Sequence, residues 1–239
     1  MTDIPAFVQR LSIDAVPLLL AITFHEAAHG YVAERKGDPT ARMLGRVTLN
    51  PLAHVDPIGT ILLPAILILT NSPFLFGWAK PVPVNFRLLR NQKTDPVYVA
   101  AAGVVTNMML AFAAGLVLQG IGLLDPVSLR KAMFYARTHL FPSGDGGTQT
   151  VLLPLALMCV AAVKWNVLLA IFNLIPIPPL DGGRIAVGLL PYGPSQALAS
   201  VERYGMLILI VLLMFDPFGV IRGILYPVMS FLFSLFLGG

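Results

Sequence analysis

Apolar residues are gathered into long, nearly continuous runs along this chain. The first run extends over about residues 13–33, close to the ~20 residues that a helix needs to cross a bilayer. Later runs lie at about 58–76, 97–124, 151–175, 204–215 and 220–237. Runs of this length with so few charged residues are typical of membrane-spanning helices. The pattern therefore predicts an all-α polytopic membrane protein, built as a bundle of five to six transmembrane helices.

The run at 58–76 differs from the others because helix-breaking residues interrupt it. Pro64 and Pro73 lie inside it, and a segment rich in glycine and proline, 77–83, follows directly. Proline removes a backbone donor and disfavours the helical conformation of the residue before it. We therefore expect a re-entrant or broken element with short β segments beside it, in surroundings lined by protein or water. A re-entrant run would place residues 34–56 in the cytoplasm by the positive-inside rule.

The run at 97–124 is rich in small residues, which are typical of helices at the centre of a membrane bundle. Alanine and glycine fill positions 100–103 and most of 111–115. The two longest polar connections, 34–56 and 125–150, are each under thirty residues, too short for a separate folded domain. We expect a single transmembrane domain over residues 1–239.

The composition agrees with a membrane protein and excludes an ordinary soluble domain, a typical nucleic-acid binder and a disulfide-bonded scaffold. Hydrophobic residues make up 56% of the 239 residues and charged residues only 12%, about half the ~25% of an ordinary soluble domain. The net charge of +4 comes from basic residues spread along the chain, many beside apolar runs. This placement is typical of contacts with lipid headgroups, so no nucleic-acid partner is expected. The single cysteine, Cys159, allows no intrachain disulfide and is expected to pack inside its apolar run.

The candidate chemistry is concentrated in H-E-A-A-H, residues 25–29, near the end of the first apolar run. Histidines four positions apart lie on one face of a helix, one turn apart, so the imidazoles of His25 and His29 can bind one Zn²⁺. Glu26 then stands where a general base for hydrolysis is needed. A helix facing water would explain the same residues, but ionisable groups inside an apolar run of membrane-spanning length indicate function.

A catalytic zinc site usually has a third protein ligand, and the residues alone leave its identity open. The metzincin pattern would place a histidine where this chain has Arg35, and a thermolysin-like site would use Glu34 or Glu202. Asp181 is a further candidate, because prolines before it and glycines after it can hold a carboxylate in packed surroundings. An Asp-Gly turn at the membrane surface explains the same residues equally well.

Combined with H-E-A-A-H, the later sequence N-L-I-P-I-P-P-L-D-G at 173–182 resembles the site-2 protease family of intramembrane zinc metalloproteases. The segments 49–59, 77–85 and 102–107 resemble its short bacterial branch, so the similarity covers about 13–190. Many members carry a PDZ domain between the motif helices, and this chain has no room for one. The resemblance implies a catalytic core over the matched residues, followed by two C-terminal apolar segments within about 204–237.

The family implies a role for each matched residue of the two motifs. In that family the two histidines and the later aspartate bind zinc, and the glutamate is the catalytic base. The resemblance therefore implies that His25, His29 and Asp181 are ligands of Zn²⁺ and that Glu26 is the base. It further implies a multi-pass protein of a bacterial cytoplasmic (inner) membrane.

Three further residues are candidates for substrate binding. Similarity to the family suggests that Asn107 and Asn173 position a substrate strand or stabilise an oxyanion, although interhelical hydrogen bonds explain amides in apolar runs as well. His54, with Asp56 two residues later, is a candidate for an alternative ligand, a regulatory group or a lid residue, and equally for an ordinary loop histidine. Lys164 lies within an apolar run and is expected to snorkel or to face water.

The expected function is hydrolysis of peptide bonds in or near transmembrane segments of membrane-protein substrates. The expected partners are such a transmembrane protein or peptide and the lipid bilayer; the sequence assigns no oligomeric state. A membrane metal-ion transporter or channel is an alternative, which predicts several ligand clusters along one path. A catalytically silent membrane scaffold is another, which the intact Glu26 disfavours.

Overall fold

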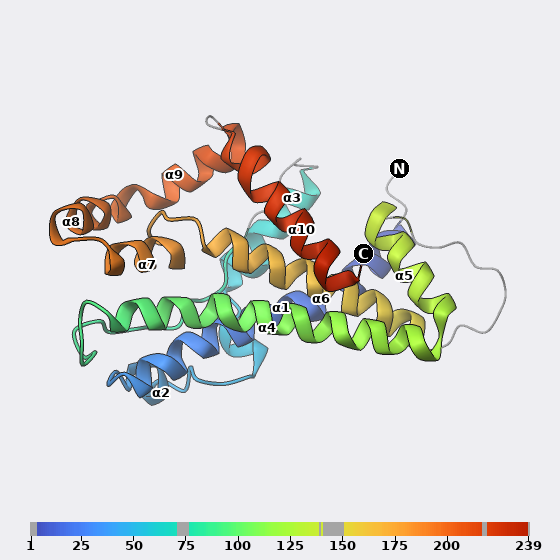
Figure 1. Ribbon diagram of the computed structural model, residues 1–239, viewed down its shortest axis with the longest axis horizontal. Helices are drawn as coiled ribbons and strands as arrows, with labels where there is room; N and C mark the ends of the chain where they lie inside the picture. The colour runs from blue at the N-terminus through green and yellow to red at the C-terminus, as the bar shows by residue number, and fades with distance from the viewer. Residues whose placement is uncertain (1–3, 71–76, 139, 141–150, 217–218, 239) are drawn as a thin grey trace.

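The computed structural model describes residues 4–70, 77–138, 140, 151–216 and 219–238 of the chain (Figure 1). Helices account for most of these residues, and no strand occurs among them. The helical elements, of which η1 is a 3-10 helix and η2 and η3 are π-helical, are α1 (Ile4–Arg35), α2 (Thr40–Met43), η1 (Pro51–His54), η2 (Pro57–Leu62), α3 (Leu63–Leu69), α4 (Asp95–Leu124), α5 (Pro126–Thr138), α6 (Leu152–Asn173), α7 (Asp181–Leu189), α8 (Tyr192–Ser200), α9 (Glu202–Phe215), η3 (Ile221–Leu225) and α10 (Tyr226–Leu237). The all-α class predicted from the apolar runs is confirmed.

Three long helices, α1, α4 and α6, pack on one another at the centre of the molecule. In Figure 1, α4 and α6 run side by side along the long axis, α5 packs on one end of the pair, and α10 crosses over α6. Ala111 of α4 and Val163 and Val167 of α6 are fully buried where α10 covers this pair. Small side chains on α4 allow these helices to approach closely, which agrees with the central place predicted for the run at 97–124.

Three helices are long and apolar enough to cross a membrane: α1 over Leu11–Arg35, α4, and α6. The pair α8 and α9 meets the same criterion only as one broken span, because the two helices are bent by 66°. The described residues therefore provide three or four candidate crossings, fewer than the five to six predicted. The difference arises at the C-terminal runs, where α9 ends at Phe215 and residues 221–237 form a shorter apolar helix, at the lower limit of the lengths that cross a bilayer.

The run at 58–76 is broken, as its prolines predict. Asp56 ends the preceding turn and accepts hydrogen bonds from the backbone N–H groups of Ile58 and Gly59, so that η2 begins there. The short helix α3 follows and ends at Leu69, and residues 71–76 lie outside the described part of the chain. The element formed by η2 and α3 is too short to cross a bilayer.

The short β segments expected beside this element do not form within the described residues. Residues 77–85 are extended, but their backbone donors bond to turns and side chains in place of a second strand. The N–H of Trp78 donates to the carbonyl of Gly59, and the N–H of Lys80 donates to that of His54. The segment is therefore extended, and hydrogen bonds to η1 and η2 fix one of its two edges.

Candidate metal centre

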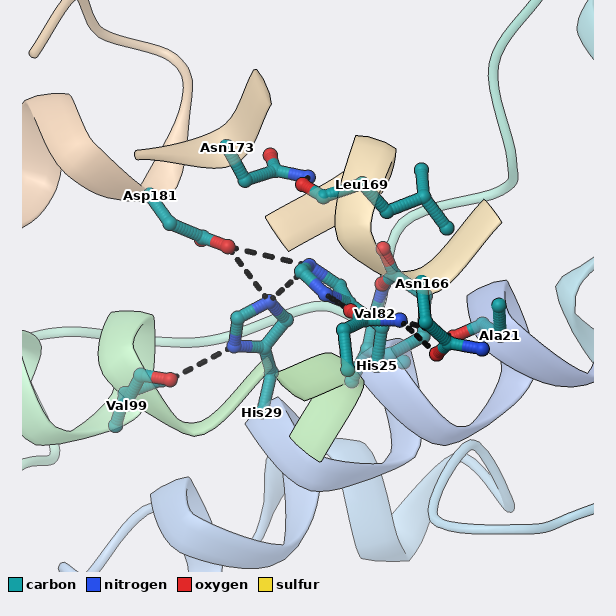
Figure 2. A network of polar contacts seen from close by, with 11 residues as sticks. Ala21, His25, His29, Val82, Val99, Asn166, Leu169, Asn173 and Asp181 are labelled. Atoms are coloured by element: carbon teal, nitrogen blue, oxygen red, sulfur yellow. Dashed lines mark hydrogen bonds and ion pairs between the residues drawn. The ribbon is translucent and has the colours of Figure 1, made fainter. Parts of the chain in front are cut away.

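The structure brings His25, His29 and Asp181 together (Figure 2). The two histidines project from one face of α1, and Asp181 is the first residue of α7. The Nε2 atoms of His25 and His29 are 3.0 Å apart. Asp181 Oδ2 lies 3.1 Å from Nε2 of His25 and 3.4 Å from Nε2 of His29. All three side chains are at most 12% exposed, so the cluster is shielded from solvent.

Asp181 reaches this cluster because the chain turns sharply between α6 and α7. A Cβ atom added at Gly182 would lie 2.2 Å from the carbonyl oxygen of Leu174, and one at Gly183 would lie 2.2 Å from the backbone nitrogen of Pro178. Only glycine fits at either position, so the two glycines after Asp181 allow α7 to begin directly against the end of the preceding turn.

The outer nitrogens of the two imidazoles are held by oxygen atoms of α4. His29 Nδ1 lies 2.7 Å from the carbonyl oxygen of Val99, and His25 Nδ1 lies 2.5 Å from Oδ1 of Asn107. Carbonyl oxygens only accept hydrogen bonds, so each Nδ1 carries the hydrogen. In a neutral imidazole the Nε2 atom is then an acceptor, and both Nε2 lone pairs point toward Asp181.

The site therefore contains three acceptor atoms facing one another without a hydrogen between them. Asp181 Oδ2 is buried and has no hydrogen-bond partner among the described residues. Ligands about 2.0–2.1 Å from a tetrahedral zinc ion are roughly 3.3 Å apart, and the three separations here are 3.0, 3.1 and 3.4 Å. Two imidazole nitrogens and one carboxylate oxygen are a typical donor set of catalytic zinc. The residues present fit this metal.

Glu26 lies next to His25 on α1, and the extended segment 77–85 holds it. The backbone N–H of Val82 donates a hydrogen bond of 2.7 Å to Oε2 of Glu26. The segment that resembles the family at 77–85 thus contacts the residue predicted to act as the base.

The structure separates the three residues proposed for substrate binding. Asn107 is fully buried, and its amide contacts His25, Ala21 and Asn166. Asn173 is at the end of α6 on the Asp181 side of the cluster (Figure 2), and its amide donates to the carbonyl of Leu169.

His54 is not part of the described His–His–Asp group. Only 2% of it is exposed, and its Nε2 lies 3.0 Å from the carbonyl oxygen of Thr48. The His54 ring contacts the turn that precedes η1, and the roles proposed for this residue stay predictions.

Two polar groups inside the long helices were not singled out from the sequence. Asn166 of α6 accepts a hydrogen bond from the amide of Asn107. Asp14 of α1 forms an ion pair with Lys164 and accepts a hydrogen bond from the indole N–H of Trp165. Lys164 was expected to snorkel or face water; its side chain is 31% exposed and pairs with a carboxylate on the neighbouring helix, and the expectation stays a prediction. A polar residue inside an apolar run was the available signal in each case.

A bundle of apolar helices with a buried His–His–carboxylate cluster, and with a glutamate next to the first histidine, defines a membrane metallopeptidase. Residues 14–215 match the sequence profile of peptidase family M50, the site-2 protease family, and the chain belongs to this family. The chain is therefore a zinc-dependent protease.

Relatives with the same assignment occur in bacteria. The chain is 34% identical over 220 residues, 90% of this chain and 84% of the relative, to "Putative zinc metalloprotease YwhC" of Bacillus subtilis (strain 168). It is 29% identical over 196 residues, 82% of this chain and 64% of the relative, to "Putative zinc metalloprotease Rip2" of Mycolicibacterium smegmatis. No solved structure matches the chain.

Proposed function

We propose that this protease hydrolyses peptide bonds in or next to the transmembrane segments of other membrane proteins, in the cytoplasmic membrane of a bacterium. One observation carries the proposal: two of the three side chains of the metal-binding cluster belong to a candidate membrane span and rest on a second one. His25 and His29 belong to α1, and their rings rest on α4. A peptide that reaches the cluster passes between or beside these helices, so a membrane segment is the natural substrate.

The reaction assigns separate tasks to the residues of the cluster. Zinc held by His25, His29 and Asp181 would supply a Lewis acid for the scissile carbonyl and a water that is nucleophilic at neutral pH. Glu26 takes the proton of the attacking water and returns it to the leaving amine. We assign this transfer to Oε1, because Oε2 is held by the N–H of Val82. That hydrogen bond keeps the carboxylate in one orientation through both proton transfers.

The substrate must be extended when it is cleaved, because a helix hides its carbonyl groups in i to i−4 hydrogen bonds. The extended segment after α3 offers one edge for such a strand. The N–H groups of Trp78, Lys80 and Val82 all bond to the protein, so the residues between them face the opposite side. On that side Pro81 and Pro83 have carbonyl groups and no N–H. An unwound substrate would donate its N–H groups to these carbonyls by strand addition.

A metal-ion transporter would need several ligand groups along a path. Within the ranges that the structure describes, His25, His29 and Asp181 are the one group of three or more metal-ligating side chains. A single closed cluster with a glutamate beside it favours hydrolysis over transport. Transport is tested in the same preparation, because the proposal predicts no zinc flux across liposomes that contain the protein.

The decisive experiment compares Glu26→Gln with the wild-type protein, both full length and reconstituted in liposomes with a single-span membrane protein as substrate. Glutamine has the size of glutamate and still accepts from the N–H of Val82, but it cannot take a proton. Cleavage should fall by about 10²–10⁴-fold, the usual contribution of a general base. The zinc content should stay at the wild-type value.

Glu34→Gln is the matched control, because Glu34 lies on the same helix and pairs with Arg42 outside the cluster. This variant should cleave at the wild-type rate. Undiminished cleavage by Glu26→Gln would contradict the proposed role of the base.

A further inference from the structure

We propose that α4 and α6 preset the metal site through residues that touch neither metal nor substrate. Asn107 of α4, held in turn by Asn166 of α6, fixes the tautomer and orientation of His25, and Gly103 provides the space in which the His25 ring lies. These three are positioning residues. The inference rests on the proposed role of His25 as a zinc ligand.

One face of α4 runs along the two histidines. Val99, Gly103 and Asn107 are each four positions apart, so they lie on the same side of the helix. The carbonyl of Val99 accepts from His29, and Oδ1 of Asn107 accepts from His25. A Cβ atom added at Gly103 would lie 2.6–2.7 Å from three ring atoms of His25. Any side chain at position 103 would displace that ring.

The orientation of the Asn107 amide is determined by its other contacts. Its Nδ2 donates to the carbonyl of Ala21, at 3.2 Å, and to Oδ1 of Asn166, at 2.8 Å. The Asn166 amide is oriented in the same way, because its Nδ2 donates to the carbonyl of Ala162 at 2.9 Å. Rotating either amide by a half turn would bring oxygen against oxygen. Only Oδ1 of Asn107 can therefore face His25.

This chain of hydrogen bonds determines which nitrogen of His25 is available to a metal. Because Asn107 presents an acceptor, Nδ1 of His25 carries the hydrogen and Nε2 keeps its lone pair toward Asp181. Asn107 is 0% and Asn166 3% exposed, so water does not compete for these contacts. His29 differs, because its partner is the main-chain carbonyl of Val99. Side chains thus control the first histidine, and the backbone controls the second.

The test measures zinc affinity and the imidazole tautomer in the full-length protein purified in detergent. Asn166→Leu removes the acceptor that orients Asn107, so zinc should bind about 10–100-fold more weakly, the usual effect of losing an outer-shell partner. Competition with a chelator gives this affinity. In the metal-free protein, ¹⁵N NMR of labelled histidine should show the Nδ1–H tautomer of His25 for the wild type and a mixture for the variant.

Gly103→Ala is a second, independent variant, and it should weaken zinc binding as well by displacing the His25 ring. Thr23→Val is the matched control. Thr23 is 1% exposed, and its hydroxyl donates to the carbonyl of Leu19 within α1. Removing this hydroxyl costs a buried hydrogen bond two residues before His25 without touching Asn107. Its zinc affinity should equal that of the wild type.

The outcomes separate this inference from the metal site itself. Wild-type zinc affinity in both Asn166→Leu and Gly103→Ala, while His25→Ala loses zinc, would overturn the positioning role and leave the metal site intact. An equal loss in Thr23→Val would also overturn it, because any disturbance of packing would then have the same effect. Wild-type affinity in His25→Ala would overturn the metal site and the inference together.

Discussion

Two polar clusters lie between α1 and its neighbours, and they are built in opposite ways. Near the start of α1, Asp14 meets the ammonium of Lys164 and the indole N–H of Trp165. About three turns later, His25, His29 and Asp181 meet. The first cluster joins one acceptor group to donors of the protein. The second brings together three acceptors and no donor.

The difference separates a structural ion pair from a metal site. Ionisable groups inside membrane-spanning helices are costly unless they are paired. Asp14 and Lys164 offset this cost within the chain, because each neutralises the other. The histidine cluster holds an aspartate whose Oδ2 lacks a hydrogen-bond partner among the described residues, and only a cation completes it. Burial alone therefore does not identify the active site; the balance of donors and acceptors does.

The largest expected difference between the two clusters is in zinc affinity after the aspartate of each cluster is replaced by alanine. Asp181→Ala should weaken zinc binding by at least about 100-fold, since a bound zinc ion gains roughly 3 kcal/mol per ligand. Asp14→Ala should leave zinc affinity unchanged. Zinc per chain, measured by atomic spectrometry after dialysis against a chelator, checks both. Full zinc retention by Asp181→Ala would remove Asp181 from the site.

The next effect is on stability when the cation is removed. At a free zinc concentration about 100 times its dissociation constant, zinc stabilises the folded protein by about 2.7 kcal/mol. A chelator should therefore lower the unfolding temperature of the wild type and leave that of Asp181→Ala unchanged. Differential scanning calorimetry in detergent measures both. Equal shifts in the two proteins would show that the metal binds elsewhere.

Replacing one residue of the ion pair should lower the free energy of unfolding, whereas replacing both residues should leave it nearly unchanged. Asp14→Leu or Lys164→Leu leaves one charge without its partner. Breaking a buried pair costs about 3–5 kcal/mol, and the partial exposure of these side chains, 22% and 31%, reduces the expected loss to about 1–3 kcal/mol. The double variant should lie within about 1 kcal/mol of the wild type. Denaturant unfolding of all three variants tests this, and a double variant less stable than either single one would contradict it.

The smallest effect is expected at Cys159. The thiol is buried in α6 outside both clusters, so Cys159→Ala should cost about 1 kcal/mol or less and leave zinc affinity and cleavage unchanged. Chelator competition and the liposome assay check these values. A loss of zinc in this variant would indicate a sulfur ligand and contradict the proposed donor set.

The part of the site that lies on a single helix, His25 and His29, could be predicted from the sequence. The spacing of His25 and His29 is a property of a single helix, so their common face follows from local geometry. Asp181 lies far along the chain, and the residues alone explained it equally well as a surface turn. The resemblance to the family was needed to select Asp181, and the structure then places its Oδ2 atom 3.1 Å from Nε2 of His25.

Contacts between helices could not be predicted in the same way. α4 and α6 are apolar on nearly every side, so no amphipathic pattern indicates which face meets a neighbour. The partners of Asn166 and Asp14 depend on how each helix is rotated about its own axis. These contacts are therefore seen only in the structure. The described residues provide three or four candidate crossings where five to six were predicted, because an apolar run does not reveal where its helix ends.

The most direct test of the account is X-ray absorption at the zinc edge of the purified full-length protein. The account predicts one zinc ion per chain with two imidazole nitrogens and oxygen ligands at about 2.0–2.2 Å, and the loss of this zinc signal in His25→Ala. A sulfur ligand at about 2.3 Å, or an unchanged spectrum in His25→Ala, would contradict it.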